Sequence, residues 1–344
     1  MVSFVVPTLN SAATLGECLD SIRAQDWPTD DIEIIVADAG STDGTVELAR
    51  SKGADVICSN PLRTGEAGKA AGIEASSGDF IALVDSDNIL PGRDWLKRMM
   101  APFADPEVFA SEPIRYEARR DDPSLVRYFA LLGMNDPICL FAGNYDRVCA
   151  VTGKWTGMRV PAEKKDGWLK LRPASEMPTI GANGFIFRRS MLARVEWKPY
   201  FFDIDVAASA VAAGCGAIAK VDAGIIHLYC PRFRTFARKQ RRRICDFLYF
   251  SRQRGRTYPW KRNGMQGVVF FSLCAVTVLP LFVQALLFAV RAPKGDRRLA
   301  FWHPVVCFAT FCIYAYHVLA MAAGARPRMA DRSSWQSPGG RAGG

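Results

Sequence analysis

Short apolar runs alternate with amphipathic stretches over the first ninety residues of the chain. Residues 3–6, 33–37 and 80–84 are rich in β-branched and aromatic side chains and have the length of strands. Residues 14–24 and 45–51 space their apolar positions three or four apart, which predicts helices. Strands that alternate with helices through short connections are typical of a parallel sheet with helices on its faces. The pattern therefore predicts an α/β fold.

Two much longer apolar runs lie near the C-terminus. Residues 264–290 and 299–325 each form a stretch of 27 residues without Asp, Glu, Lys or Arg. A helix of about 20 residues crosses the hydrocarbon layer of a bilayer, so we expect a C-terminal pair of membrane helices. The segment that connects them is basic, which is unusual for an outside loop. Helices that enter the near leaflet and return are therefore one alternative, and a buried hairpin in a soluble protein is another.

Charge is divided unevenly along the chain, whose net charge is +10. Residues 1–231 hold 24 basic and 31 acidic side chains, a net charge of −7, whereas residues 232–344 hold 20 basic and 3 acidic ones, a net charge of +17. The basic residues border the apolar runs rather than an aromatic-bearing soluble face. This placement indicates contact with anionic membrane lipids and disfavours binding to nucleic acid.

These patterns predict four segments. Residues 1–231 form a catalytic domain, 232–263 a basic juxtamembrane segment, 264–325 the membrane helices, and 326–344 a disordered tail. The ten cysteines contain no CxxC pair, and the N-terminus has no basic, apolar leader, so we expect reduced thiols. The predicted location is the membrane, with the catalytic domain on the cytoplasmic side. The pattern does not indicate an oligomeric state.

Polar residues follow each of the three predicted strands, at the edge where parallel sheets bind ligands. Two carboxylates two positions apart can hold Mg²⁺ or Mn²⁺ together with a diphosphate, although an acidic surface turn is the alternative. A P-loop is excluded because Arg63 and Ala70 occupy its glycine and hydroxyl positions. The candidate residues at the strand ends are Pro7, Thr8, Asn10, Asp38, Asp85, Ser86 and Asp87.

Five segments occur in the order seen in family 2 glycosyltransferases: VVPTLN, VADAGSTDGT, GKAAGIEASSGDFIALVDSD, GANGFIFRRSML and DIDVAASAVAAG. The chain resembles this family over about residues 1–245. The resemblance implies a GT-A, Rossmann-like, mostly parallel sheet flanked by helices. It also implies a nucleotide-sugar donor, a Mg²⁺ or Mn²⁺ ion, and transfer with inversion.

The resemblance also implies roles for individual residues. Those matching Pro7, Asp38 and Lys69 line the nucleotide pocket, which we extend to Thr8, Asn10, Ser86 and Asp85. Asp85 and Asp87 match the metal motif, with Asp87 the usual direct ligand. Asp203 matches the catalytic base, although Phe202 replaces the glutamate of that pattern, and an ordinary helix N-cap is the alternative. Asn183, Gly184 and Asp205 are candidates for contact with the acceptor.

Two further residues are candidates through the same resemblance. His227 ends an apolar run where the family often places a histidine that contacts the metal or the diphosphate; a structural histidine is the alternative. Gln240 and Arg243 resemble the Q-x-x-R-W motif of processive synthases, but Ile244 replaces the tryptophan, which favours transfer of a single sugar. Arg243 is therefore a candidate ligand of the donor diphosphate, or part of a basic strip beside the membrane.

The predicted function is transfer of a sugar from a UDP- or GDP-sugar to a lipid-linked or glycolipid acceptor, with Asp203 as the base. If Asp203 only caps a helix, a polyprenyl phosphate becomes the acceptor, because its oxygen is already anionic. Sugar nucleotidyl transfer is disfavoured, since no Gly-rich segment with Arg and Lys follows the first strand. A membrane-anchored binder of nucleotide sugars without turnover is a third hypothesis.

Overall fold

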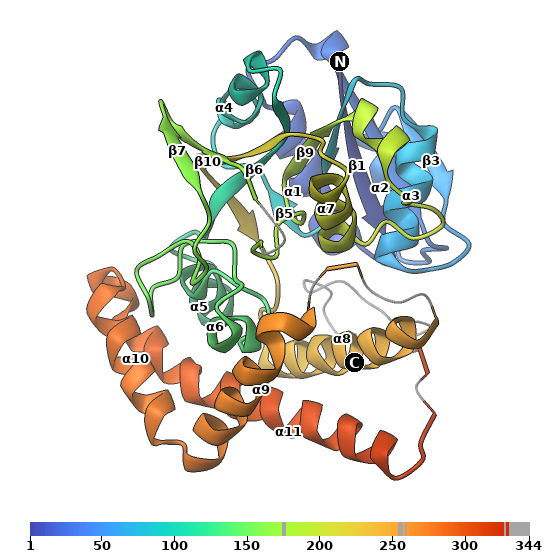
Figure 1. Cartoon of the computed structure of the whole chain (residues 1–344). Helices are drawn as coiled ribbons and strands as arrows, with labels where there is room; N and C mark the ends of the chain where they lie inside the picture. The colour runs from blue at the N-terminus through green and yellow to red at the C-terminus, as the bar shows by residue number, and fades with distance from the viewer. Residues whose placement is uncertain (174–176, 254–256, 259, 327, 330–344) are drawn as a thin grey trace. The chain divides into compact units, whose positions relative to one another are not determined.

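The computed structural model describes residues 1–173, 177–253, 257–258, 260–326 and 328–329 (Figure 1). Its contacts divide the chain into two compact units. The first unit contains residues 1–115 and 160–228, and the second contains residues 116–159 and the described residues from Tyr229 onward. The predicted tail from residue 330 lies outside the described residues.

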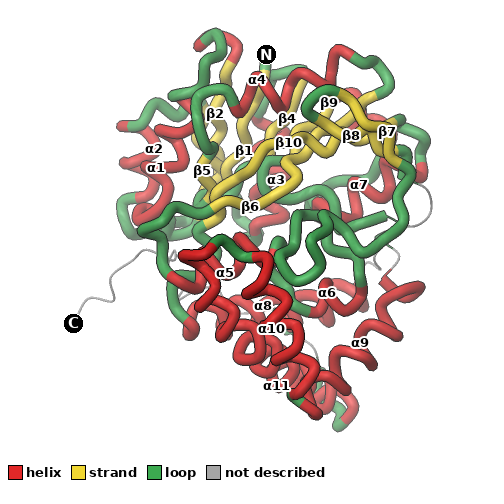
Figure 2. The backbone as a smooth tube through the Cα atoms, turned by 90° about the vertical axis from the view of Figure 1, so that its left-hand side faces the viewer, coloured by secondary structure: helices red, strands yellow, loops and turns green. Residues whose placement is uncertain are grey.

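The first unit is built on a single mixed sheet, drawn in yellow in Figure 2. Among the described residues, ten strands follow the order β3-β2-β1-β4-β9-β6-β10-β8-β7, with β5 paired to β10. The first four of these are parallel, as predicted, but β9 runs antiparallel to β4 and β6, and β8 runs antiparallel to β10. The strands are β1 Val2–Thr8, β2 Ile32–Asp38, β3 Val56–Ser59, β4 Phe80–Leu83, β5 Asn88–Ile89, β6 Val108–Glu117, β7 Ala162–Lys165, β8 Trp168–Leu171, β9 Phe185–Arg188 and β10 Ala217–His227.

The strands and helices predicted for the first ninety residues are confirmed to within two residues at each end. Phe4, Val5 and Val6 of β1 are all fully buried, which explains why this central strand is a continuous apolar run. Helix α1 instead buries Leu15 and Ile22 along one stripe. The helices of this unit are α1 Ala12–Arg23, α2 Thr45–Ser51, α3 Gly65–Ala75, α4 Trp95–Met100 and α7 Asp203–Ala212, with short 3₁₀ helices at Thr29–Asp31, Ala101–Ala104 and Arg189–Arg194.

The register of the parallel strands brings the predicted polar residues to one edge of the sheet. Thr8 is the partner of Asp38 across β1 and β2, and Val5 is the partner of Leu83 across β1 and β4. Asp85 follows two residues after Leu83. The ends of three strands therefore share the edge at which a parallel sheet binds its ligands.

A buried ion pair lies inside this sheet. Lys220 of β10 donates to Glu112 of β6 at 2.5 Å, and both side chains are fully buried. The other Glu112 oxygen accepts the backbone N–H groups of Gly181 (2.9 Å) and Ala182 (3.2 Å). Gly181 has φ +135°, and a Cβ there would lie 2.6 Å from the Asp203 carbonyl oxygen. Glu112 thus holds the segment that packs against the first turn of α7.

We expect Glu112→Gln to lower the free energy of unfolding by about 3–5 kcal/mol, because it leaves Lys220 buried without its charged partner. The amide oxygen can still accept from Gly181 and Ala182, so the change isolates the charge. Urea unfolding measures the effect. The double variant Glu112→Gln/Lys220→Met should recover much of the loss, and a single variant as stable as the parent would contradict this reading.

The second unit is helical. Tyr128, Phe236, Phe271 and Phe288, from four helices of this unit, belong to one buried apolar cluster. Residues 116–159 contribute to this cluster and group with the C-terminal helices, although the sequence assigned them to the catalytic domain. The helices are α5 Ser124–Leu132, α6 Ile138–Ala142, α8 Phe233–Gln253, α9 Trp260–Thr277, α10 Leu279–Arg291, the 3₁₀ helix η4 Lys294–Phe301, and α11 Trp302–Ala322.

The predicted pair of membrane helices is supported in part: the described residues contain one candidate span, or two if the bent pair α9–α10 counts as one broken span. Among the described residues, one helix, Lys294–Ala322, is long and apolar enough to cross a membrane. The first apolar run is instead broken into two arms, Met265–Thr277 and Leu279–Arg291, which meet at 98°. Val278 at the break has φ +60°, and Pro280 in the first turn of α10 cannot continue the hydrogen bonding of α9. Composition alone did not reveal this break.

Candidate active site

The Asp38 carboxylate, at the end of β2, is surrounded by hydrogen-bond donors. Its Oδ1 accepts from the hydroxyls of Thr8 (2.9 Å) and Ser41 (2.5 Å). Its Oδ2 accepts from the backbone N–H groups of Gly40 (2.9 Å) and Ser41 (2.8 Å). Because a carboxylate offers about four acceptor positions, Asp38 organises the loop after β2. Direct contact with a nucleotide base stays a prediction, and it requires one of these bonds to open.

The other predicted donor-pocket residues lie in the same region of the first unit. The Asn10 backbone N–H donates to the Ser41 hydroxyl at 2.8 Å. A Cβ on Gly68 would lie 2.8 Å from the Pro7 Cβ, so α3 approaches the end of β1 closely. The Ser86 hydroxyl donates to the Ser11 hydroxyl at 2.9 Å, which ties the acidic loop after β4 to the loop after β1.

Lys69 of α3 joins the predicted base to the predicted metal motif. Its ammonium donates to the Asp203 carboxylate and lies 3.7 Å from Asp85 Oδ1. The side chains of Lys69 and Asp203 are only 8% and 12% exposed, so little water screens this contact. Burial lowers the pKa of Lys69, but the charges of Asp203 and Asp85 outweigh it and raise the pKa overall. Lys69 is therefore a fixed positive charge between two acidic side chains.

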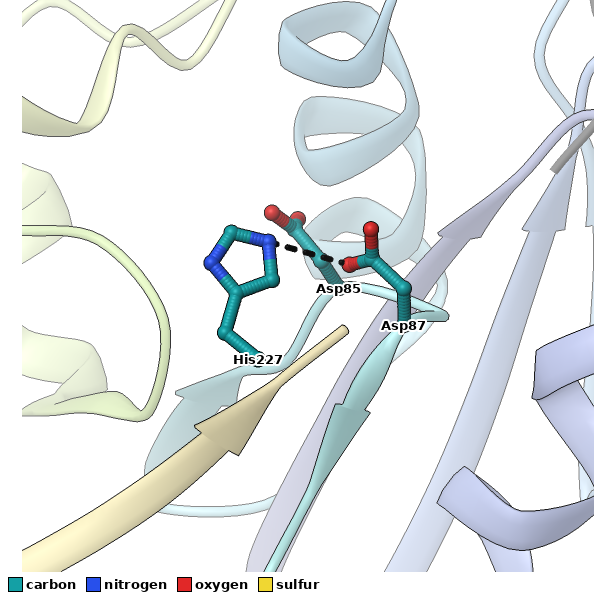
Figure 3. Close-up of side chains that lie close together, drawn as sticks. All are labelled: Asp85, Asp87 and His227. Carbon is teal, nitrogen blue, oxygen red and sulfur yellow. Dashed lines mark ion pairs between the residues drawn. The ribbon is translucent and has the colours of Figure 1, made fainter. Parts of the chain in front are cut away.

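Asp85, Asp87 and His227 form a cluster that could hold a metal ion (Figure 3). One ligand atom from each lies within 4.8 Å of those of the other two, and His227 Nε2 is 3.3 Å from Asp87 Oδ1. The two aspartates come from the loop after β4, and His227 ends β10 beside Asn88 of β5. Residues 140 positions apart in the chain thus meet at one point of the sheet edge.

The side chains of this cluster fit a hard divalent cation. Two carboxylate oxygens and one imidazole nitrogen suit Mn²⁺ or Mg²⁺, with the nitrogen favouring Mn²⁺, and leave positions for water and a diphosphate. Cys18 lies behind the loop, where its thiol donates to the Asp85 carbonyl oxygen at 3.7 Å. Burial, with added effects of Asp87 and Asp85, raises the pKa of Cys18. A neutral thiol does not compete with the oxygens for the ion.

The surroundings of Asp203 move its pKa toward neutrality, and its role as a base stays a prediction. Burial raises the pKa of Asp203 to about 7, against the opposing charge of Lys69 and with Asp85 adding to the rise. The Asp203 Oδ1 atom is buried and has no hydrogen-bond partner, whereas Oδ2 faces Lys69. A carboxylate whose pKa lies near the working pH is suited to accept a proton.

We expect turnover with a hydroxyl acceptor to fall as the pH drops through about 7, the value to which burial raises the pKa of Asp203. The base must be unprotonated to accept a proton, so its active form predominates above that pH. The measurement is kcat/KM against pH at saturating Mn²⁺. An acidic limb near neutrality is the expected result, and a profile without that limb would contradict the assignment of Asp203.

The three candidate acceptor residues are placed as follows. Asp205 is buried in the first turn of α7, two residues after Asp203. Asn183 is buried with φ +47°, and the Gly184 N–H donates to the Leu83 carbonyl oxygen at 2.8 Å. Gly181, just before them, touches the Asp203 backbone. Contact between these residues and an acceptor stays a prediction.

Arg243 belongs to the second unit. One Nη atom of its guanidinium donates to the Asn135 carbonyl oxygen (3.0 Å) and to Gln240 Oε1 (2.8 Å), and the same nitrogen lies 3.9 Å from Asp136. Gln240 also donates to the Asn135 carbonyl oxygen at 3.0 Å. The two residues that resemble the Q-x-x-R motif therefore fix the turn before α6. Binding of the donor by Arg243 stays a prediction.

Two features of the first unit were missed from the sequence. The Lys69–Asp203 pair joins positions 134 apart, and no local pattern indicates it. Glu112 could have been found from the sequence, because it is a charged residue in the mostly apolar first half of a strand, VFASEPI. A charge at such a position has to be paired when it is buried.

Parts of the chain are similar to known proteins. Residues 3–164 match the family model described as Glycosyl transferase family 2. Glycosyltransferase AglE of Haloferax volcanii is 33% identical over 102 residues, which cover 28% of this chain and 33% of that protein. A PGL/p-HBAD biosynthesis glycosyltransferase of Mycobacterium bovis is 33% identical over 106 residues, 29% of this chain and 41% of that protein. The matches span less than half the length of these relatives.

A solved structure resembles more of the chain. A mannosyltransferase from Pyrobaculum calidifontis, solved in complex with GDP-Man and Mn²⁺, has a TM-score of 0.53 at 18% identity. The likeness covers 92% of this chain and 87% of that one and supports the predicted GT-A-like fold. Asp203 and His227 lie beyond the segment matched by the family model, so this match does not support their predicted roles. By these comparisons residues 3–164 are similar to the glycosyltransferase family 2 model and, in part, to curated glycosyltransferases.

Proposed function

We propose that this chain is an inverting glycosyltransferase that moves one sugar from a UDP- or GDP-sugar to a hydroxyl of a lipid-linked acceptor at a membrane surface. The observation that carries the proposal is the joining of two sites by Lys69. This residue contacts both Asp203 and Asp85, and Asp85 clusters with Asp87 and His227. The proposed base, in α7, and the candidate cation-binding cluster are therefore linked through one lysine side chain.

The chemistry follows from these positions. Asp203 accepts the proton of the acceptor hydroxyl as that oxygen attacks the anomeric carbon, which typically contributes about 10²–10⁴-fold to the rate. Asp85, Asp87 and His227 would hold Mg²⁺ or Mn²⁺, which supplies positive charge for the departing nucleoside diphosphate. Lys69 orients the Asp203 carboxylate through Oδ2 and leaves Oδ1 for the proton.

A second candidate has one observation in its favour. The ion pair with Lys69 is also what a purely structural role of Asp203 would produce, and a catalytic base does not require such a pair. If Asp203 is only structural, the acceptor is a polyprenyl phosphate, whose anionic oxygen attacks without a base. The chain would then be a polyprenyl-phosphate sugar synthase that uses the same donor and cation.

A location at a membrane has support from the second unit. Its helices α9, α10 and α11 expose many large apolar side chains, among them Leu273, Val276, Leu279, Val290 and Leu319, each more than half exposed. Soluble monomers rarely expose apolar patches of this extent. The basic segment beside them suits anionic lipid. A cytoplasmic position of the catalytic unit is part of the proposal.

The proposal is tested by incubating the full chain with individual UDP- and GDP-sugars, Mn²⁺ and a lipid extract, and identifying products by mass. We expect one donor to yield a lipid product heavier by one sugar residue, and chelation to prevent it. Treating the product with mild acid distinguishes a sugar phosphate, which is cleaved, from a glycoside, which is retained. Transfer to soluble sugars but to no lipid would overturn the lipid-linked acceptor.

A further inference from the structure

Helices α8 and α11 lie side by side in the second unit and run in the same direction (Figure 1). The rings of Phe233 and Trp302 stack at the start of both helices, with centroids 6.4 Å apart. Further along, the Tyr314 hydroxyl donates to Gln240 Oε1 at 3.1 Å. These contacts keep the two helices together over three or more turns.

Two further contacts hold α11 in place, one with α8 and one with Asp136. Cys245 Sγ lies 3.7 Å from a ring nitrogen of His317, one turn beyond Tyr314. The Tyr314 hydroxyl also donates to Asp136 Oδ2, 2.6 Å away, in the turn before α6. The middle of α11 is therefore bonded to polar side chains of its own unit and is not surrounded by lipid.

Helix α8 cannot cross a bilayer. Phe233–Gln253 contains seven Lys and Arg residues and one acid, and Arg234, Arg238 and Arg241 are exposed. Burial and the neighbouring charges of Arg242 and Arg234 lower the pKa of Arg238, which reflects a concentrated positive charge. Charged side chains at the centre of a membrane are costly and rare. Since α11 contacts α8 from Trp302 to His317, we expect this part of the one described helix long enough to span to remain near the depth of α8.

The outer side of α11 is apolar all the same. Val305, Phe308, Cys312, Tyr316 and Leu319 are exposed, at spacings of three or four residues that place them on one stripe. The opposite side buries Val306 and Thr310. A helix with one side on protein and the other apolar and exposed suits a position in the plane of the interface.

Both arms of the bent pair α9–α10 are attached to the same part of the second unit, the segment 116–159. Gly267 of α9 packs so closely on α6 that a Cβ there would lie 2.6 Å from the Ala142 Cα. At the other end, Arg291 donates to the Val151 carbonyl oxygen at 2.5 Å, and Asp296 pairs with Arg127. Ala142, Val151 and Arg127 all belong to the segment 116–159.

Each arm of the pair is too short to cross by itself. Met265–Thr277 and Leu279–Arg291 are each 13 residues long, or about 20 Å as a helix, against a hydrocarbon layer of about 30 Å. Both arms expose apolar side chains, with Val276 and Leu279 at the bend 66% and 71% exposed. The bend itself is therefore the part of the pair suited to the acyl chains.

We propose that the second unit is monotopic: α11 lies in the interface, the α9–α10 bend dips into the same leaflet, and no helix crosses the bilayer. The partner is one leaflet that contains anionic phospholipid, whose head groups the exposed arginines of α8 meet. This inference takes from the proposed function only the presence of a membrane. It places residues 291–298 and the end of α11 on the same side as the catalytic unit.

The first test maps sidedness in sealed inside-out vesicles from cells that express the full chain. A membrane-impermeant maleimide is applied to three variants, Glu47→Cys in the catalytic unit, Lys294→Cys between α10 and α11, and Ala325→Cys after α11, all at exposed positions. Peptide mass spectrometry separates these thiols from the native ones. We expect equal labelling of the three before detergent is added.

A different pattern would overturn the proposal. If Ala325→Cys reacts only after detergent while Glu47→Cys reacts before it, α11 crosses the membrane. If Lys294→Cys is the protected site, the bent pair crosses. Labelling needs no turnover, so an inactive protein with three accessible sites would contradict the proposed function and leave the monotopic arrangement intact.

The second test measures the partner by vesicle flotation of the purified chain. We expect the chain to float with phosphatidylglycerol vesicles, and Arg234→Glu/Arg241→Glu to lower the bound fraction at least tenfold. Arg50→Glu, at an exposed position of the first unit, is the matched control and should bind as the parent does. A detergent-free soluble oligomer that does not float would show that a second copy covers the apolar faces, and would overturn the proposal.

Discussion

Replacing Asp203 by Asn should lower kcat for a hydroxyl acceptor by about 10²–10⁴-fold while donor affinity stays close to that of the parent. The amide cannot take the proton, but its oxygen can still accept from Lys69, which is otherwise 3.7 Å from Asp85. The cluster of Asp85, Asp87 and His227 is unchanged. The measurement is single-turnover transfer with the donor identified by the product screen, together with donor binding by calorimetry.

The control for this variant is Glu74→Gln. Glu74 lies on the same helix as Lys69 and pairs with Lys198 at 2.5 Å, but its side chain is 65% exposed. Loss of that carboxylate should leave the rate unchanged, because exposed ion pairs contribute little. If Asp203→Asn transfers sugar to a hydroxyl acceptor at the parent rate, Asp203 is not the base. If only a polyprenyl phosphate is glycosylated at the parent rate, the synthase alternative holds.

The candidate residues whose position in the fold could best be predicted from the sequence are those at strand ends. Asp85 directly follows a run of buried apolar residues, with Asp87 two positions later, and Asp38 ends another such run. Strand boundaries are local features of the chain, and the carboxyl edge of a parallel sheet is a general binding position. These two facts are sufficient to place the acidic loop, and the structure then brings His227 to it.

The pairing of Lys69 with Asp203 could not be predicted in the same way. It depends on how α3 and α7 pack in the first unit, and the Phe201 N–H that donates to the Glu66 carbonyl oxygen at 2.9 Å is one of the contacts that bring them together. Such contacts form between segments more than a hundred residues apart, so no spacing rule reports them. The resemblance gave each residue a role but not their contact.

The two long apolar runs show how far composition can predict the arrangement of helices at a membrane. Length and composition predicted two spans, since both runs exceed what a bilayer requires. The depth of a helix in a membrane is set by its neighbours, and here α11 has the arginine-rich α8 beside it. The first run is divided at Val278 and Pro280, two positions that an apolar count does not weigh. Composition therefore favours lipid contact, but it does not predict how the helices would meet the lipid.

Asp87→Ala should abolish Mn²⁺-dependent turnover of the donor, a loss of about 10²–10⁴-fold if the cation contributes several kcal/mol to the departure of the diphosphate. Asp87 supplies one of the three ligand atoms and lies 3.3 Å from His227. Release of nucleoside diphosphate, followed against the Mn²⁺ concentration, measures the effect.

Stability separates a lost ligand from a damaged fold. Asp85 and Asp87 are like charges in one cluster, so without metal the variant should unfold at the same temperature as the parent or above it. Mn²⁺ should raise the Tm of the parent by binding the folded state, and should leave that of Asp87→Ala unchanged. The matched control is Asp94→Ala, an exposed aspartate near the same loop, which should keep both the activity and the Mn²⁺-induced shift. If Mn²⁺ still raises the Tm of Asp87→Ala, Asp87 is not a ligand of the metal, because the proposed site cannot bind the ion without this carboxylate.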